Sequence, residues 1–61
     1  MKDVFVVIYA TEKGNYGKVK GAFAKEEDAK RAAKGFGFWG SDGYVVPLSL
    51  YENIEEYEND K

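Results

Sequence analysis

The stretch VFVVIYA, residues 4–10, decides the fold. It is built of β-branched and aromatic residues, with charged residues before it and the turn-forming residues TEKGN, 11–15, after it. A run of this kind is typical of a β-strand. Successive side chains of a strand point to opposite faces, and here both sets are apolar. The stretch therefore predicts a central strand that is apolar on both faces.

A second strand and a helix follow along the chain. Residues 18–23 alternate in polarity and predict a strand, and GNYG, residues 14–17, supplies positive-φ residues for a hairpin turn between the two strands. Residues 25–34 carry acids in the first turn and bases in the last, which matches a helix dipole, and Gly35 is the natural C-terminal cap. The inward stripe of this helix consists of alanines, so the strands and rings must supply most of the core.

The remaining segment predicts a third strand and a helical turn. Residues 44–51 are the strand, and Pro47, which cannot donate to a ladder, places it at an edge or a bulge. Asn53 and Glu56 have capping-box spacing, which predicts a C-terminal helical turn with Ile54 and Tyr57 facing inward. The predicted fold is α+β in one domain, 1–61: a small three-stranded antiparallel sheet in ββαβ order, one helix packed on one face, and a short C-terminal helical turn.

One helix covers only one face of such a sheet. We expect the covered face to take the second strand's apolar side, and the other face to stay open unless the 36–44 loop or the C-terminal turn folds over it. The covered set is Val4, Val6, Ile8, Val19, Gly21, Phe23, Val46, Leu48 and Leu50. The open set is Phe5, Val7, Tyr9, Lys18, Lys20, Val45 and Tyr51.

The size of the chain makes this open face important. A domain of 61 residues is marginal in stability, and this one has no Cys and no His, so disulfides are excluded and a zinc site has no soft ligands. Self-association as a homodimer is one remedy. Dense packing of the aromatic residues, 16% of the chain, is the competing one.

The ring-rich segment GFGFWGSDGY, residues 35–44, bears on function. Its G-x-G-x-x-G spacing follows a helix and precedes a strand, whereas a dinucleotide fingerprint needs the reverse order. KGFGF, residues 34–38, resembles the RNP1 signature of RNA-recognition motifs, and Val4, Phe5 and Val6 resemble the start of RNP2. That resemblance implies single-stranded nucleic-acid binding by stacking on Phe5, Phe36 and Phe38. The net charge of −2 argues against phosphate binding.

A second resemblance spans most of the chain. GAFAKEEDAKRAA, residues 21–33, with the returning strand VVPL, 45–48, resembles small uncharacterised ββαβ proteins of bacteriophages and bacteria. The resemblance implies a viral protein that binds and inhibits a host enzyme or defence factor in the host cytoplasm. The short apolar run after Lys2 and Asp3 also predicts a cytoplasmic protein with no signal peptide and no membrane span.

The hypothesis that follows is a non-enzymatic protein–protein interaction module. Small-ligand sequestration, with a nucleotide held between the Gly-rich loop and the sheet, is a further alternative. We expect no catalytic residue, metal or cofactor, since converging polar groups are absent from the sequence pattern. The expected partner-binding residues are Phe5, Tyr9, Phe36, Phe38, Trp39, Tyr44 and Tyr51. The residues expected to steer a basic partner surface are Glu52, Glu55, Glu56 and Glu58.

Overall fold

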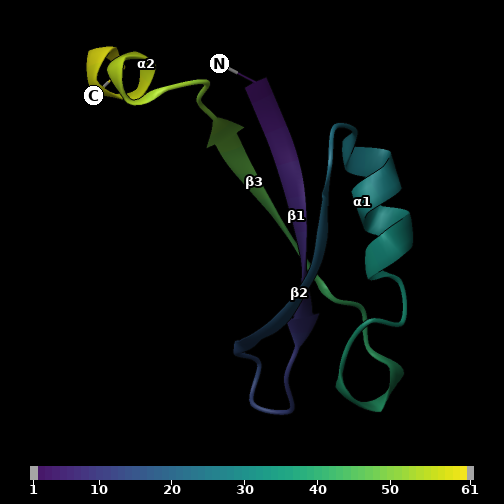
Figure 1. Ribbon diagram of the computed structural model, residues 1–61. Coiled ribbons are helices and arrows are strands. Elements are labelled where there is room, and N and C mark those ends of the chain that lie inside the picture. Colours follow the sequence, from purple (N-terminus) through teal and green to yellow (C-terminus); the bar gives the residue numbers. More distant parts are fainter. Residues whose placement is uncertain (1, 61) are drawn as a thin grey trace.

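The central strand β1 spans Lys2–Ala10 and is flanked on both sides in a computed structural model that describes residues 2–60. The strands β2, Tyr16–Phe23, and β3, Tyr44–Leu50, both pair with it antiparallel in the order β2-β1-β3 (Figure 1). The helices are α1, Glu26–Ala33, and α2, Ile54–Asn59, with a single 3₁₀ turn at Phe38–Gly40 between α1 and β3. The predicted α+β fold, with a central first strand, is confirmed.

The β1–β2 turn is built from residues 11–15. Gly14 has φ +76°, and among residues 14–17 it alone takes the left-handed conformation expected there. Thr11 closes the turn, because its backbone N–H donates to the Asn15 carbonyl and its Oγ1 accepts from the Asn15 N–H, both at 3.0 Å. The side chain of a turn residue thus satisfies backbone groups that the ladder leaves free.

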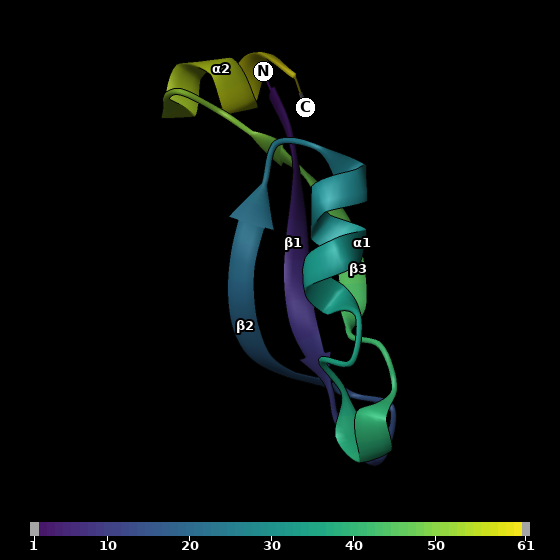
Figure 2. The same cartoon turned by 90° about the vertical axis from the view of Figure 1, so that its right-hand side faces the viewer.

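The helix α1 packs on the sheet through its alanines. Ala29 and Ala33 are buried, and Val7 of β1, with no exposed surface, lies beneath them. Figure 2 looks onto this side and shows α1 lying over β1 and β3. Gly35, with φ +74°, ends the helical segment as expected. Methyl side chains let the helix approach closely, so the buried cluster itself is small.

The expected assignment of the two sheet faces is wrong for β1 and β3. Phe5 and Val7 face α1, together with Val45 of β3, whereas the even-numbered residues of β1 face away from the helix. The faces of β1 are set where its pairing with β2 is regular: Phe5 opposes Phe23 and Val7 opposes Gly21, so these residues lie together under the helix. Beyond Val7 the register shifts twice, between Val7 and Ile8 and between Ile8 and Ala10. Each shift inserts an extra β2 residue and breaks the period-two alternation. Val19 therefore opposes Ile8 on the uncovered face, and Phe23 opposes Phe5 under the helix.

The C-terminal segment leaves the sheet after β3. Pro47 lies in an edge strand, as predicted, and the Asn53 side chain accepts the Glu56 N–H at 2.9 Å, which confirms the predicted cap of α2. The helix does not fold inward, however. Ile54 and Tyr57 are 62% and 43% exposed, and α2 projects beyond the end of the sheet on the side away from α1 (Figure 1). The expectation that these two residues face a core is wrong.

Candidate protein-interaction surfaces

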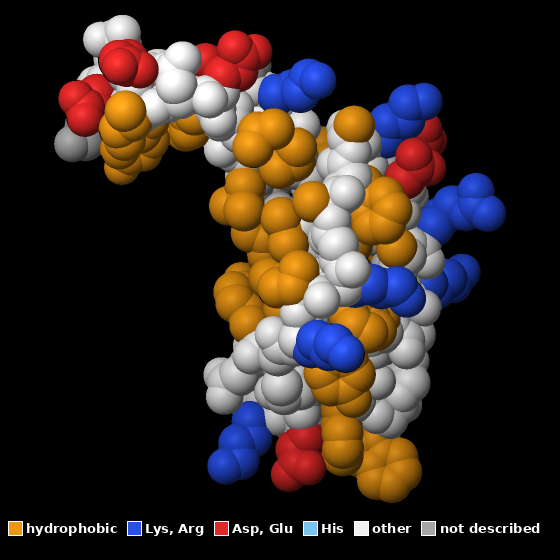
Figure 3. Space-filling view, viewed as in Figure 1, with side chains coloured by type: hydrophobic (Ala, Val, Ile, Leu, Met, Phe, Trp, Pro, Cys, Tyr) orange, Lys and Arg blue, Asp and Glu red, His pale blue; other side chains and the backbone are white. Residues whose placement is uncertain are grey.

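The face of the sheet opposite α1, here called the open sheet face, is apolar and uncovered. α1 packs on all three strands from the other side, and α2 has no comparable packing on any of them. In Figure 3 hydrophobic side chains gather along the left side of the body, below the projecting α2. The face consists of Val4, Val6, Ile8 and Ala10 of β1, Tyr16, Val19 and Ala22 of β2, and Tyr44, Val46, Leu48 and Leu50 of β3.

Exposure on this face is high for large apolar side chains. Tyr16 is 64% exposed and Val19 is 57% exposed on β2, while Leu48 and Leu50 on β3 are 51% and 52% exposed. Lys2, which opposes Leu50 at the end of β1, is the charged residue at the edge of this apolar set. A continuous apolar area on a small domain marks an interaction site, because exposing it to water is unfavourable.

One end of the open sheet face is closed by two tyrosines. The rings of Tyr16 and Tyr44 meet edge to face at 5.1 Å between centroids. The Tyr44 hydroxyl donates to the Gly14 carbonyl at 2.6 Å, which ties β3 to the hairpin turn. The Tyr44 ring thus lies on the open sheet face, and its polar atom is already satisfied.

The segment from Tyr51 to Asp60, here called the C-terminal arm, is internally braced. The Tyr51 hydroxyl donates to Asp60 Oδ2 at 2.9 Å, and the Tyr51 and Tyr57 rings meet edge to face at 5.2 Å. With the Asn53 cap these contacts span both ends of α2. The arm is therefore a formed element, and Ile54 is exposed at the start of its helix.

The 3₁₀ turn carries a second exposed feature, the aromatic tip formed by Phe38 and Trp39. Trp39 is 90% exposed and has φ 60° and ψ 30°, the left-handed conformation that bulky residues avoid. Its ring meets the half-buried Phe38 ring edge to face at 5.3 Å. Holding a non-glycine residue in this conformation costs about 1–2 kcal/mol, so the surrounding loop must impose it.

Hydrogen bonds on both sides of the aromatic tip hold the loop. The Ser41 Oγ donates to the Phe38 carbonyl at 2.8 Å, and Asp42 Oδ1 accepts the Gly35 N–H at 3.0 Å. The Gly43 N–H donates to the Ala33 carbonyl at 2.7 Å, which fastens the end of the loop to α1. Trp39 is thus presented from a braced loop.

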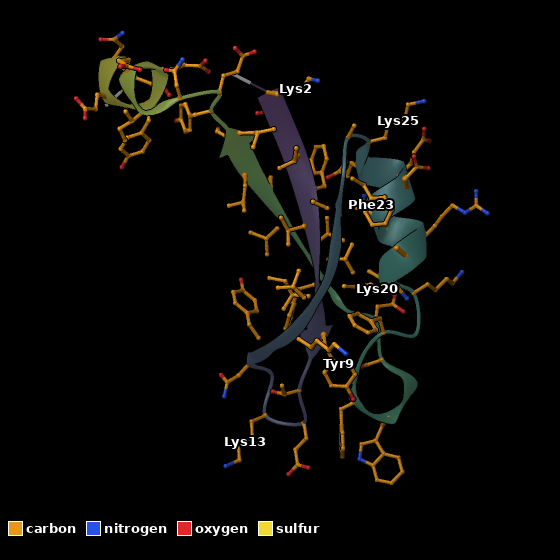
Figure 4. All side chains as sticks on the ribbon, viewed as in Figure 1. Lys2, Tyr9, Lys13, Lys20, Phe23 and Lys25 are labelled. Carbon is orange, nitrogen blue, oxygen red and sulfur yellow. The ribbon has the colours of Figure 1, made fainter. Side chains whose placement is uncertain are left out.

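A shallow cleft of about 350 Å³ lies beside the tip. Phe38 forms one wall, and Tyr9 with the β1–β2 turn forms the other, so the cleft opens between two segments far apart in the sequence. Figure 4 shows Tyr9 next to the loop and Lys13 at the end of the turn. The cleft offers an apolar floor with one basic and one acidic side chain, Lys13 and Glu12, at its rim.

The structure divides the expected partner-binding residues among four places. Phe38 and Trp39 form the tip, Tyr44 lies on the open sheet face, and Tyr51 braces the C-terminal arm. Phe5, Tyr9 and Phe36 lie on the α1 side of the sheet. Phe5 and Phe36 pack against the buried cluster, and the expectation that Phe5 and Tyr9 line an open face is wrong because that face carries the helix.

Phe36 belongs to the packing below α1. Its ring meets Tyr9 edge to face at 5.3 Å, and Lys20 Nζ sits 4.8 Å from its centroid, a cation–π contact. Figure 4 shows Lys20 and Tyr9 at this loop. The RNA-recognition resemblance requires Phe5 and Phe36 on the sheet face away from the helix, and here both lie on the helix side.

The acidic residues and the aromatic tip do not form one surface. The described chain is elongated, 42 × 22 × 13 Å, with α2 at one end of the long axis and the Phe38–Gly40 turn at the other (Figures 1 and 2). Glu52, Glu55 and Glu58 are exposed on the arm, and Glu56 is half-buried there. A partner bound at Trp39 would therefore not contact these acids.

Sequence reasoning missed most of the open sheet face. Tyr16, Val19 and Leu50 carry much of its exposed area, and none was expected to bind a partner. The missing signal is the double register shift in β2, which inverts the face of Val19 relative to Phe23. The hints of it in the sequence are Gly17 and Gly21, two glycines inside the strand that lie beside the two shifts.

Comparison with known proteins finds no matching family model, no matching curated protein and no matching solved structure. None of the helices within residues 2–60 is long and apolar enough to cross a membrane. Over the same residues, no cluster of His, Cys, Asp or Glu side chains is placed to hold a metal ion. The exposed surfaces of the described residues are therefore the features that point to a function.

Proposed function

We propose that this chain is a non-enzymatic protein–protein interaction module that binds its partner with the aromatic tip. The observation that carries the proposal is Trp39, 90% exposed at φ 60°. Both features are unfavourable for an isolated molecule, since the ring meets water and the backbone is strained. Burial of the ring against a partner turns the first of these costs into binding free energy.

The form of the tip favours tight binding. Tryptophan is among the residues enriched in interface hot spots, which lie in pockets of the partner and contribute about 2 kcal/mol or more. The Ser41 and Asp42 hydrogen bonds hold the loop before binding. A preordered contact loses little conformational entropy on association. The partner surface that fits is a concave apolar pocket, and the adjacent cleft receives a side chain from its rim.

The resemblance to small phage and bacterial ββαβ proteins narrows the kind of partner. It favours an inhibitor of a host enzyme or defence factor, met in the cytoplasm. A convex ring on a rigid loop suits such a role, because enzymes expose concave pockets near their chemistry. The inhibitor hypothesis adds no residue to the site: Trp39 enters the pocket, and Phe38 supports it.

The test compares two alanine variants at opposite ends of the molecule. Trp39→Ala is expected to weaken partner binding by about 30-fold or more, with a native circular dichroism spectrum. Ile54→Ala removes an exposed apolar side chain from the arm and is the matched control. Partners are captured by cross-linking in cell lysate, purified, and titrated by isothermal calorimetry with each variant.

Two results contradict the proposal. Equal affinity of Trp39→Ala and the wild type for the purified partner means that the tip is not the contact. Loss of folding in Trp39→Ala means that the ring is structural despite its exposure. Binding of a nucleotide or of a single-stranded oligonucleotide in the same titration, with no protein partner, favours one of the alternative functions instead.

A further inference from the structure

We propose that the open sheet face binds the same face of a second copy of this chain, with the C-terminal arm of each copy packed against the sheet of the other. This goes beyond the proposed function, because it uses none of the tip residues. It assigns an occupant to a face that carries four exposed large apolar side chains, Tyr16, Val19, Leu48 and Leu50. It also gives a role to the arm, which leaves its own sheet.

The chain exposes more surface than a compact monomer of its mass, as one subunit of a dimer does. The surface is 4784 Å² for a mass of 6.9 kDa, whereas a compact monomer of that mass exposes about 4,000 Å². The excess of about 800 Å² equals what one partner of a standard protein interface buries. The radius of gyration, 13.3 Å, likewise exceeds the roughly 10.5 Å of a compact domain of this length.

The buried cluster is too small to stand alone. It consists of Val7, Ala29 and Ala33, and Val7 is the one large side chain with no exposed surface in the described chain. A fold with so little buried apolar area needs a cover that is present whenever the chain is made. A second copy always meets that condition, and a heterologous partner does so only when it is co-expressed.

The arm and the face are complementary parts of one surface. Apart from Trp39, the exposed large apolar side chains of the described residues lie either on the open sheet face or on α2. α2 projects on the side of the open face, so it rises above the plane into which a second sheet would dock (Figures 1 and 3). A two-fold interface requires a self-complementary surface, and a face that carries both a projection and its receptor meets this condition.

Charge selects the orientation of the two copies. The exposed acids Glu52, Glu55 and Glu58 lie on the arm, and a pairing that places the two arms together sets these like charges against each other. The opposite orientation brings each arm to the partner's β1–β2 turn and the start of β2, where the exposed Lys13 and Lys18 outnumber the exposed Glu12. The strands of the two sheets then run in opposite directions, and the two aromatic tips point to opposite ends of the dimer.

The first test measures the oligomeric state by sedimentation velocity. The wild type is expected to be a dimer, and Leu48→Glu, which places a charge within the open sheet face, is expected to weaken dimerisation by about 100-fold or more. Trp39→Glu adds the same charge at an exposed apolar position outside the face and should leave the dimer intact. A wild type that sediments as a monomer at every concentration, or equal dimerisation of the Leu48→Glu variant, overturns the proposal.

The second test does not depend on the folding of Leu48→Glu. The chain contains no cysteine, so introduced thiols report single positions. A Tyr16→Cys/Ile54→Cys variant is expected to form covalent dimers with a short bismaleimide, because the arm of one copy meets the turn end of the other. Each single variant should remain uncross-linked. Cross-linking of Ile54→Cys alone, or none in the double variant, overturns the arrangement.

These tests are independent of the proposed function. A tip that binds no partner leaves the dimer unaffected, and a monomeric wild type leaves the Trp39→Ala comparison intact. Binding of a different protein to the open sheet face of a monomeric wild type assigns that face to a heterologous partner and overturns the present proposal.

Discussion

The two faces of the sheet are similar in composition, but one is buried and the other is exposed. On one face Val7 is completely buried beneath Ala29 and Ala33. On the other, Val19 and Leu48 keep more than half of their surface in contact with water. The difference between the faces is the covering element, since both present valines and aromatic rings. Apolar character alone does not determine which side of a small sheet becomes core.

Close approach explains which face received the helix. Gly21 lies opposite Val7 on the helix side, and the alanines of α1 meet the sheet there with methyl groups only. The small side chains of α1 therefore allow a short distance between helix and sheet, with the rings of Phe5 and Phe23 packed around the contact. The open face has no such element, and its valines and leucines suit a second sheet, which packs about 10 Å away with interdigitating side chains.

The largest expected loss of folding stability comes from a charge placed on the covered face of the sheet. Ala29→Asp puts a carboxylate at a position with no exposed surface and no basic partner among the cluster residues. We expect a loss of about 4 kcal/mol, enough to unfold a domain of this size. Far-UV circular dichroism and thermal unfolding measure it.

The control for this variant lies on the same helix. Arg31 is exposed, so Arg31→Asp changes the charge on α1 without burying it and should cost only a few tenths of a kcal/mol through the helix dipole. Equal losses in the two variants would mean that α1 is not held by its alanine face. A folded Ala29→Asp domain would contradict the buried cluster itself.

Two milder substitutions compare a valine of the covered face with a valine of the open face. Val7→Ala should cost about 2 kcal/mol at every protein concentration, because it removes buried methyl groups and leaves a cavity. Val19→Ala, 57% exposed in the single chain, should cost about 0.5 kcal/mol in dilute solution through lower β propensity. Urea unfolding at several protein concentrations provides both values.

The dependence of these two costs on protein concentration distinguishes a monomer from a dimer. If two copies pack through the open sheet face, the cost of Val19→Ala grows with protein concentration as the dimer forms, while that of Val7→Ala stays constant. A concentration-independent Val19→Ala effect is the result expected of a monomer. The two valines thus report separately on the core within a chain and on the contact between chains.

Local signals predicted the elements of the fold but not the faces of the sheet. The β-branched run of β1, the Gly35 cap and the Asn53–Glu56 capping box each act within a few residues, and each was read correctly from the sequence. The face of each β1 residue depends on strand register instead. The pairing of Phe5 with Phe23 decides which β1 residues lie under the helix, and the extra residues of β2 then turn Val19 to the other face, which period-two counting cannot anticipate.

The candidate sites show the same limit. The ring-rich segment was correctly singled out, yet its rings divide between the core, with Phe36 against Tyr9, and the solvent, with Trp39. That division depends on the left-handed conformation of Trp39, a residue whose type gives no hint of positive φ. Long-range placement also separated the acidic arm from the tip, although only a single strand lies between them in the sequence.

The smallest effect concerns the arm that stands beside the open sheet face. The hydrogen bond to the Asp60 carboxylate raises the pKa of Tyr51 above its ordinary value of 10.0. A group with a raised folded pKa contributes stability below its unfolded pKa, and the contribution is lost as the pH rises through the folded value. The arm should therefore be intact at neutral pH and loosen only above about pH 10. Tyrosinate absorbance should show a late-titrating ring whose titration moves to lower pH in Asp60→Asn. Tyr51→Phe should remove the same step while Tyr44→Phe leaves it, and a late step that survives Tyr51→Phe would place the perturbed hydroxyl elsewhere.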